Sequence, residues 1–194
     1  MFQIPHLPQA LFVGGNTLNK LLMIFIALTF NSCIQGQMEH DSTKINLSGL
    51  HLKSIPDSIF DCKNLTYLDL GSSKVVFYPP LSALVDSNAN ELTELPDKIE
   101  RLTNLKTLIL NSNKLTTLPA TIGKLTNLEV LDLSINKDLD IIGEIDKINK
   151  LPKLKVLKLI DVKLSRNDLG ILRQSLRQDI RIVLSINEYF EKPD

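Results

Sequence analysis

The residue types that usually carry catalysis or bind metals are sparse in this chain of 194 residues. His40 and His51 have no second histidine or cysteine at the short spacing that a zinc site requires. Serine and threonine are plentiful, but no nucleophile elbow or partner histidine accompanies them, and no glycine-rich phosphate loop follows a strand. The sequence therefore predicts no catalytic residue, no metal site and no cofactor.

Cys33 is the one residue whose setting suggests covalent chemistry. It comes shortly after Leu21–Phe30, an apolar run of ten residues that itself follows Lys20. Such a run is too short to span a bilayer and has the length of a signal-peptide core. The ending Phe-Asn-Ser-Cys resembles a bacterial lipobox, in which a signal peptidase cuts before a cysteine that becomes acylated. The resemblance implies a signal peptide over residues 1–32 and a lipid on Cys33.

Two alternatives remain for this leader. It could be an ordinary signal peptide cut elsewhere, with Cys33 incidental, or a retained membrane helix, which its length disfavours. The 19 residues before Lys20 carry no charge, unlike the basic start of a signal peptide. Initiation at Leu18 would supply a basic start, so the assignment of residues 1–17 to the protein is suspect.

Leucines recur from Leu92 to Asn136 with a period of 23 residues. Such a period, in the range of about 20–29 residues, indicates a solenoid, because one unit cannot bury its own apolar face and needs stacked neighbours. We call each unit a coil. Within a coil, leucine alternates with polar residues as in a short strand with one buried face. The positions that repeat are Leu105, Leu108, Leu110 and Asn113, and then Leu128, Leu131, Leu133 and Asn136.

An asparagine follows each of these strands, and a Leu-Pro-x-x-Ile segment returns along the outer side. The amide of the asparagine can satisfy backbone groups of its own and adjacent coils. The spacing resembles the 23-residue class of the leucine-rich repeat family. The resemblance implies an α/β repeat solenoid, a short curved horseshoe with a parallel sheet on its concave face. The expected asparagine ladder contains Asn90, Asn113 and Asn136.

We expect the repeats to extend over residues 45–164. Leu65 and Leu105 are 40 residues apart, which is 17 more than one period. Either residues 74–90 form an inserted loop, or a shortened coil is followed by a degenerate coil with Val85 facing inward and Asn90 in the ladder. The second interpretation is favoured because it gives a coil of 23 residues without adjustment.

The two ends of the solenoid are expected to differ. Ser165 and Asp168 fit a capping box ahead of a helix over about 166–177, and a strand should follow near 180–184. Residues 165–194 would thus form a cap that covers the core and the sheet edge. At the other end, residues 33–44 contain only the acylated cysteine and a tether.

The outward positions of the strands should form the concave surface, where leucine-rich repeat proteins typically bind partners. An exposed apolar row, strongest in the C-terminal coils, marks a candidate interface. Asp69, Asp86 and Asp132 share one place in three coils and suggest a solvated stripe or partner contact, since a cation would need more oxygen ligands. The candidate binding residues are Tyr67, Asp69, Asp86, Asn88, Thr107, Ile109, Asn111, Val130, Asp132, Ile135, Val156, Lys158 and Ile160.

Composition agrees with an exported binding module. Without residues 1–32 the chain has 21 basic and 22 acidic residues, which gives no electrostatic basis for nucleic-acid binding. If Cys33 is acylated, Cys62 is left alone and no disulfide is expected. We expect a non-enzymatic protein of a bacterial outer membrane or cell surface, bound to the membrane only through its lipid, that binds another protein. The alternatives are a structural or adhesive spacer, or a polysaccharide binder, for which Tyr67 is the only aromatic residue of the face.

Overall fold

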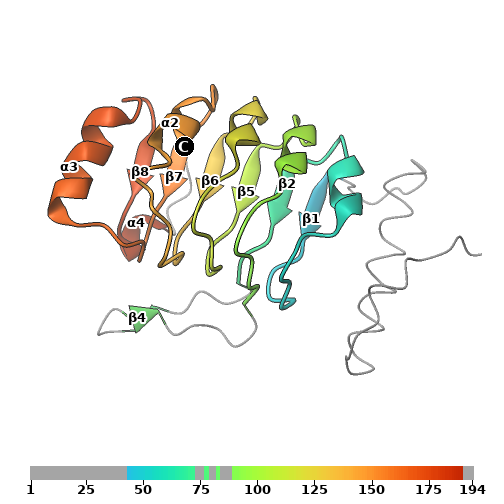
Figure 1. The fold of residues 1–194 in the computed structure, drawn as a ribbon, viewed down its shortest axis with the longest axis horizontal. Coiled ribbons are helices and arrows are strands. Elements are labelled where there is room, and N and C mark those ends of the chain that lie inside the picture. The colour runs from blue at the N-terminus through green and yellow to red at the C-terminus, as the bar shows by residue number, and fades with distance from the viewer. Residues whose placement is uncertain (1–42, 73–76, 79–81, 84–88, 190–194) are drawn as a thin grey trace, which may run out of the picture. The chain divides into compact units, whose positions relative to one another are not determined.

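The computed structural model describes residues 43–72, 77–78, 82–83 and 89–189. Within them, six short parallel strands form one sheet in the order β1-β2-β5-β6-β7-β8 (Figure 1). This sheet confirms the expected α/β repeat solenoid. The strands are β1 (Lys44–Asn46), β2 (Tyr67–Asp69), β5 (Thr107–Ile109), β6 (Val130–Asp132), β7 (Val156–Lys158) and β8 (Arg181–Val183).

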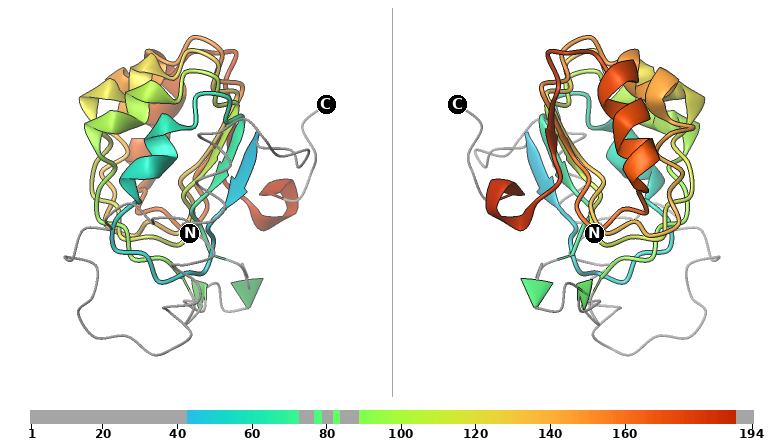
Figure 2. Two further views of the ribbon diagram at one scale, coloured as in Figure 1. Left: turned by 90° about the vertical axis from the view of Figure 1, so that its right-hand side faces the viewer. Right: turned by 90° about the vertical axis from the view of Figure 1, so that its left-hand side faces the viewer.

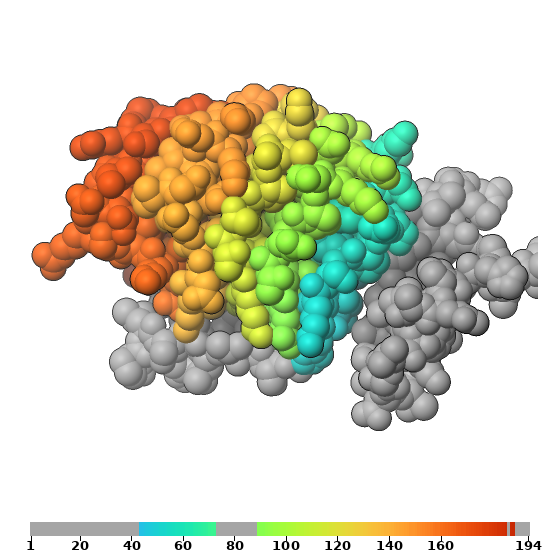
Figure 3. All heavy atoms as spheres, in the orientation of Figure 1, coloured from blue at the N-terminus to red at the C-terminus, as the bar shows by residue number. Residues whose placement is uncertain are grey.

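The middle residue of each strand points into the core. Leu68 lies opposite Leu108, and Leu131 lies opposite both Leu108 and Leu157; all four side chains are fully buried. Ile45 and Ile182 hold the same place in the two outermost strands and are partly exposed, because each has a neighbouring strand on one side only. In the space-filling view, successive coils form adjacent bands in sequence order (Figure 3).

Short helices form the side of the solenoid away from the sheet (Figure 2). Three of them are 3-10 helices that each follow a proline, whose fixed φ suits the start of a helical turn. Each contributes a buried isoleucine: Ile59, Ile99 or Ile122. The longer fourth coil lacks this proline and forms an α-helix instead. These elements are η2 (Asp57–Asp61), η3 (Asp97–Arg101), η4 (Ala120–Lys124) and α2 (Ile145–Asn149).

Three buried asparagines connect neighbouring coils. The Asn113 side chain accepts a hydrogen bond from the Leu92 N–H and donates to the carbonyls of Leu70 and Leu110, all at 3.0 Å. Leu110 is in the same coil as Asn113, whereas Leu70 and Leu92 belong to the coil before it. Asn136 repeats the pattern with Leu115, Leu110 and Leu133, and Asn90 with Leu52, Leu47 and Leu70.

The degenerate coil favoured from the sequence is wrong. Strand β2 pairs directly with β5, so no strand containing Val85 lies between them. The extra residues form an insertion, within which β3 (Phe77–Tyr78) and β4 (Ser82–Ala83) pair antiparallel. The places expected for Asp86 and Asn88 on a strand between β2 and β5 therefore do not exist, and these two residues lie outside the described part of the chain.

The insertion lies between the strand and the ladder position of the same coil. Asn90 is in the ladder, as the degenerate-coil interpretation required, but it belongs to the coil that begins at Leu65. If the 17 extra residues are left out, Leu65–Ser72 and Asn90 have the same spacing as Leu105–Ser112 and Asn113. An insertion at this place leaves the register of the strands and of the ladder intact.

The C-terminal cap contains the expected helix and strand. Helix α3 (Arg166–Ser175) starts with a capping box: Ser165 Oγ accepts from the Asp168 N–H, and the Asp168 carboxylate accepts from the Ser165 N–H at 2.8 Å. These hydrogen bonds hold the pKa of Asp168 below its usual value. Strand β8 then pairs with β7. A further short helix, α4 (Ile186–Tyr189), was not expected from the sequence.

The leader and Cys33 lie outside the described residues. None of the helices that the structure describes is long and apolar enough to cross a membrane.

We expect a variant that lacks residues 73–89 to fold into the same six-stranded solenoid. The deletion joins Ser72 to Asn90 and restores the 23-residue spacing, so Ser72 takes the place that Ser112 has in the next coil. A shorter connection also costs less closure entropy. Thermal unfolding followed by circular dichroism should give a Tm within about 4 °C of the wild type, which corresponds to roughly 1 kcal/mol in a chain of this size.

A deletion of equal length, residues 76–92, is the matched control. It removes Asn90 and the fully buried Leu92, and should abolish cooperative unfolding. Equal damage from both deletions would show that the insertion is part of the solenoid core.

Candidate protein-binding surface

The first and third residues of the strands point away from the core and form two rows across the sheet, on the surface expected to be concave. We call this surface the sheet face. The first row is Lys44, Tyr67, Thr107, Val130, Val156 and Arg181. The second row is Asn46, Asp69, Ile109, Asp132, Lys158 and Val183.

The sheet face is open at its N-terminal end, whereas at its C-terminal end Asp132, Val156 and Val183 are buried and Arg181 is exposed. Side chains of β1 are exposed, and those of β2 and β5 on this face are partly exposed. Further along, Asp132 and Val183 are only 2% and 1% exposed. Helix α4 lies on the sheet side of the solenoid, away from the return helices (Figure 2). The open part therefore comprises β1, β2, β5 and the first residue of β6.

The expected exposure of Ile135, Val156 and Ile160 is wrong, because their side chains are only 5%, 6% and 6% exposed. Val156 and Ile160 pack with Val183 in an apolar cluster, and the partly buried Val130 packs against it. The strand pattern correctly placed Val156 outward from the core, but it carried no information about α4. Ile135 precedes Asn136 and has a positive φ of 59°. The residues at the same position in other coils, Gly49, Ser112 and Asp161, also have positive φ.

A pocket of about 220 Å³ lies on the sheet face, and Glu188 of α4 forms part of its wall. Its lining combines apolar side chains such as Ile109 and Val130 with the charged Asp132, Lys158 and Arg181. Burial lowers the pKa of Lys158, and the neighbouring Arg181 adds to this while Asp132 opposes it. The pocket suits a group that brings both apolar and polar atoms, and it contains no nucleophile–base pair.

The acidic residues of the sheet face have a structural role as well. Asp69 Oδ1 accepts from the Gly71 N–H at 2.9 Å, and Asp132 Oδ1 accepts from the Ser134 N–H at 3.0 Å. Burial raises the pKa of Asp69, and the Asp132 charge adds to this. Burial also raises the pKa of Tyr67, and the charge of Asp69 raises it further. Among the described residues, no group of three or more His, Cys, Asp or Glu side chains could hold a metal ion.

Asn111 is buried rather than available to a partner. Its Oδ1 accepts a hydrogen bond from the Ser72 N–H at 3.0 Å, across the boundary between two coils. The contact is possible because residue 71 is glycine: a Cβ there would lie 1.8 Å from the Asn111 oxygen. The sequence indicates this contact only through the pairing of the small Gly71 with the larger Asn111. That pairing can be recognised only once β2 is known to lie beside β5.

We expect Gly71→Ala to lower the free energy of unfolding by about 1–3 kcal/mol, because the new methyl group displaces Asn111 and leaves the buried Ser72 N–H without its acceptor. Gly170→Ala is the matched control: nothing lies within 4 Å of a Cβ at this position of α3. The control should raise stability by about 0.5–1 kcal/mol through helix propensity. Urea unfolding measures both, and a neutral Gly71→Ala would contradict the role assigned to Asn111.

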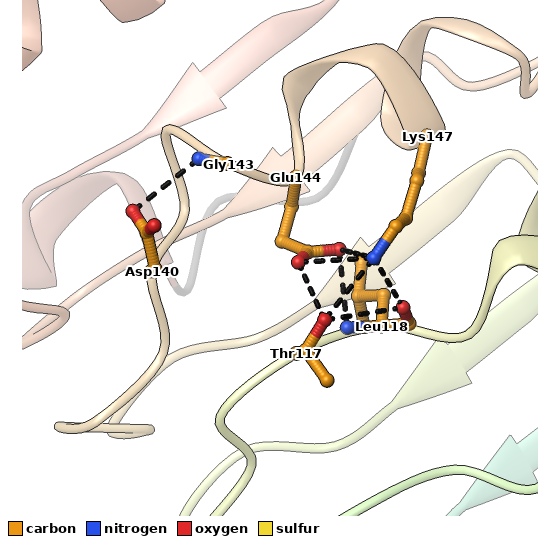
Figure 4. A network of polar contacts seen from close by, with 6 residues as sticks. All are labelled: Thr117, Leu118, Asp140, Gly143, Glu144 and Lys147. Atoms are coloured by element: carbon orange, nitrogen blue, oxygen red, sulfur yellow. Dashed lines mark hydrogen bonds and ion pairs between the residues drawn. The ribbon is translucent and has the colours of Figure 1, made fainter.

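A second polar cluster lies between η4 and α2, and no pattern in the sequence indicated it (Figure 4). The buried Glu144 carboxylate accepts from the Thr117 hydroxyl at 2.7 Å and from the Leu118 N–H at 3.1 Å. Lys147 forms an ion pair with Glu144 at 2.9 Å and donates to the Leu118 carbonyl at 2.6 Å. These contacts satisfy both the N–H and the C=O of Leu118, so the cluster joins two coils. We assign it a structural role.

Part of the chain matches a known protein family. Residues 85–137 match the family model described as leucine rich repeat. A solved leucine-rich repeat protein of Leptospira interrogans is 20% identical, with a TM-score of 0.34, over 82% of this chain and 57% of its own length. The chain thus spans little more than half the length of that protein. No curated protein matches it. The family match identifies leucine-rich repeats over residues 85–137, and the stacked strands with their asparagine ladder continue the same repeat architecture on both sides of that region.

Proposed function

We propose that this chain is a non-enzymatic module that binds another protein through the open part of its sheet face. Leucine-rich repeat domains are generally protein-interaction modules. The observation that carries the proposal is a row of partly exposed side chains on three adjacent strands: Tyr67, Thr107, Ile109 and Val130. The last three of them line the pocket together with charged side chains. Half-buried apolar groups next to fixed charges are typical of the centre of a binding surface.

The size and chemistry of this surface favour a protein partner. From β1 to β6 it spans three strand spacings, roughly 15 Å, which is wide enough for a partner's loop or helix. A partner would place an apolar side chain on Ile109 and polar groups near Asp69, whose carboxylate is only partly buried. A polysaccharide is the weaker candidate, since Tyr67 is the only aromatic side chain that the structure describes on the sheet face. A spacer would need no such surface.

We expect the double variant Tyr67→Ala, Ile109→Asp to lose about tenfold or more in affinity for its partner. Residues 39–194, which form one compact unit, would be used to capture partners from a native envelope extract. Stability should change by no more than about 1 kcal/mol, because neither side chain belongs to the core. Ile135 is unsuitable for this test, because a charge there would be buried.

Lys124→Glu is the control on the opposite side, at the exposed end of η4. It should leave capture unchanged. Normal capture by the double variant, together with loss of capture by Lys124→Glu, would mean that the partner uses the return-helix side.

The anchoring part of the proposal is that the protein is exported and held at a bacterial outer membrane or cell surface by a lipid on Cys33. Its support comes from the sequence alone: a short apolar run, a preceding lysine, and a cysteine directly after Ser32. A lipid would bind the membrane without a spanning helix, and the sheet face would remain available to a partner.

We expect the mature protein to begin at Cys33 and to carry acyl chains, and Cys33→Ser to be neither acylated nor cut at this position. Intact-mass analysis and labelling with an alkyne fatty acid in the bacterial host would measure this. Cys62→Ser is the matched control and should remain acylated, because Cys62 is buried in the first coil. A mature mass that starts at any other residue would rule out the lipid anchor.

A further inference from the structure

The C-terminal end of the sheet face combines a buried apolar cluster with the charged side chains of Lys158 and Arg181. Val156, Ile160 and Val183 are 6%, 6% and 1% exposed and form one cluster with Val130 against it. In the earlier strands, the place of Val156 is held by Lys44, Tyr67, Thr107 and the partly buried Val130. Val156 and Val183 point away from the core and are nevertheless almost fully buried, so another part of the chain must cover them.

Helix α4 is positioned to be that cover. It begins at Ile186, after a link of only Leu184 and Ser185 from the end of β8, so it must lie close to the last strands. It lies on the sheet side of the solenoid (Figure 2). Its Glu188 lines the same pocket as Val156, Lys158 and Arg181.

The hydrogen bonds of Glu188 connect α4 to the link that precedes it. Glu188 accepts from the Leu184 N–H at 3.4 Å and donates its own N–H to Ser185 Oγ at 3.3 Å, both long distances. A helix of four residues is about one turn and has little stability of its own. Segments of this kind open locally at a small fraction of the global free energy of unfolding.

We propose that α4 is a displaceable internal ligand of the sheet face, and that a partner gains the surface of β6–β8 by replacing it with a segment of similar chemistry. That segment brings apolar side chains to Val156 and Val183 and a carboxylate to the pocket that contains Lys158 and Arg181. This inference rests on the proposed function, since it divides the sheet face into an open half and a half that opens when a partner competes with α4.

A synthetic peptide of residues 185–194 tests the proposal without knowledge of the partner. Residues 39–184, which lack α4, should bind the labelled peptide saturably in an anisotropy titration. Residues 39–194 should bind it at least about tenfold more weakly, because a segment on a short link competes at an effective concentration in the millimolar range. A peptide with Glu188→Lys, and a truncated chain with Arg181→Glu, should each reduce binding several-fold.

Equal binding to both chain lengths, or no binding to a truncated chain that circular dichroism shows to be folded, would overturn the proposal. Loss of the proposed function would look different: the peptide results would stand, while substitutions in the open half would leave partner capture unchanged.

A second measurement keeps α4 in place and decides the matter if the truncated chain does not fold. In residues 39–194 carrying Val156→Cys, the other thiol is Cys62, which is 2% exposed in the core. A bulky maleimide should label the introduced thiol at least about tenfold faster than Cys62, because the introduced thiol needs only the opening of α4, whereas Cys62 needs the core to open. Adding Glu188→Lys should accelerate labelling of the introduced thiol alone. Equal rates for the two thiols, or a rate at the introduced thiol that Glu188→Lys leaves unchanged, would overturn the proposal.

Discussion

The boundary between two coils buries backbone N–H and C=O groups that the three-residue strands do not pair. An unpaired buried group of this kind costs about 1–3 kcal/mol, so a stack of coils needs a partner for each of them. Asn90, Asn113 and Asn136 supply these partners, because one amide both accepts from an N–H and donates to two carbonyls. The spacing of the leucines and the pairing of the strands both depend on these bonds.

This requirement also explains why a long insertion is tolerated within one coil. The additional residues begin after Ser72 and end before Asn90, so neither the strand nor the ladder asparagine changes place. The side chain of Asn111, in the next coil, accepts a hydrogen bond from the N–H of Ser72, the last residue before the insertion. The sheet face therefore stays continuous from β2 to β5, and the surface proposed to bind a partner is not interrupted.

The sequence predicts those features of the fold that the repeat itself carries. The period places Leu68, Leu108 and Leu131 in the core, and the Ser165–Asp168 spacing predicts the cap helix. It could not decide between an insertion and a degenerate coil, because Asn90 takes the ladder position both in a degenerate coil and after an insertion that ends at residue 89. That choice depends on which strands pair, a long-range contact with no local signal.

The candidate site was harder to predict, and for a related reason. Alternation along a strand gives the direction of a side chain but not what lies above it, so Val156 and Ile160 were wrongly expected to be exposed. Val156 lies on the side of the sheet where α4 lies, and α4 is outside the repeat pattern. Ile160 holds the place of Asn111 and Ser134, which are buried as well. Similarly, Asn111 was expected to face a partner, whereas the partner of its amide oxygen is a backbone N–H of the preceding coil.

The bonds of the ladder have a direction along the chain. Each asparagine bonds its own coil and the one before it: Asn90 bonds Leu47 and Leu52, Asn113 bonds Leu70 and Leu92, and Asn136 bonds Leu110 and Leu115. A ribosome makes and releases the chain in this same order, and N-terminal parts fold first during synthesis. Each newly released coil therefore closes the open polar end of the coil made just before it, and the solenoid can grow by one coil at a time.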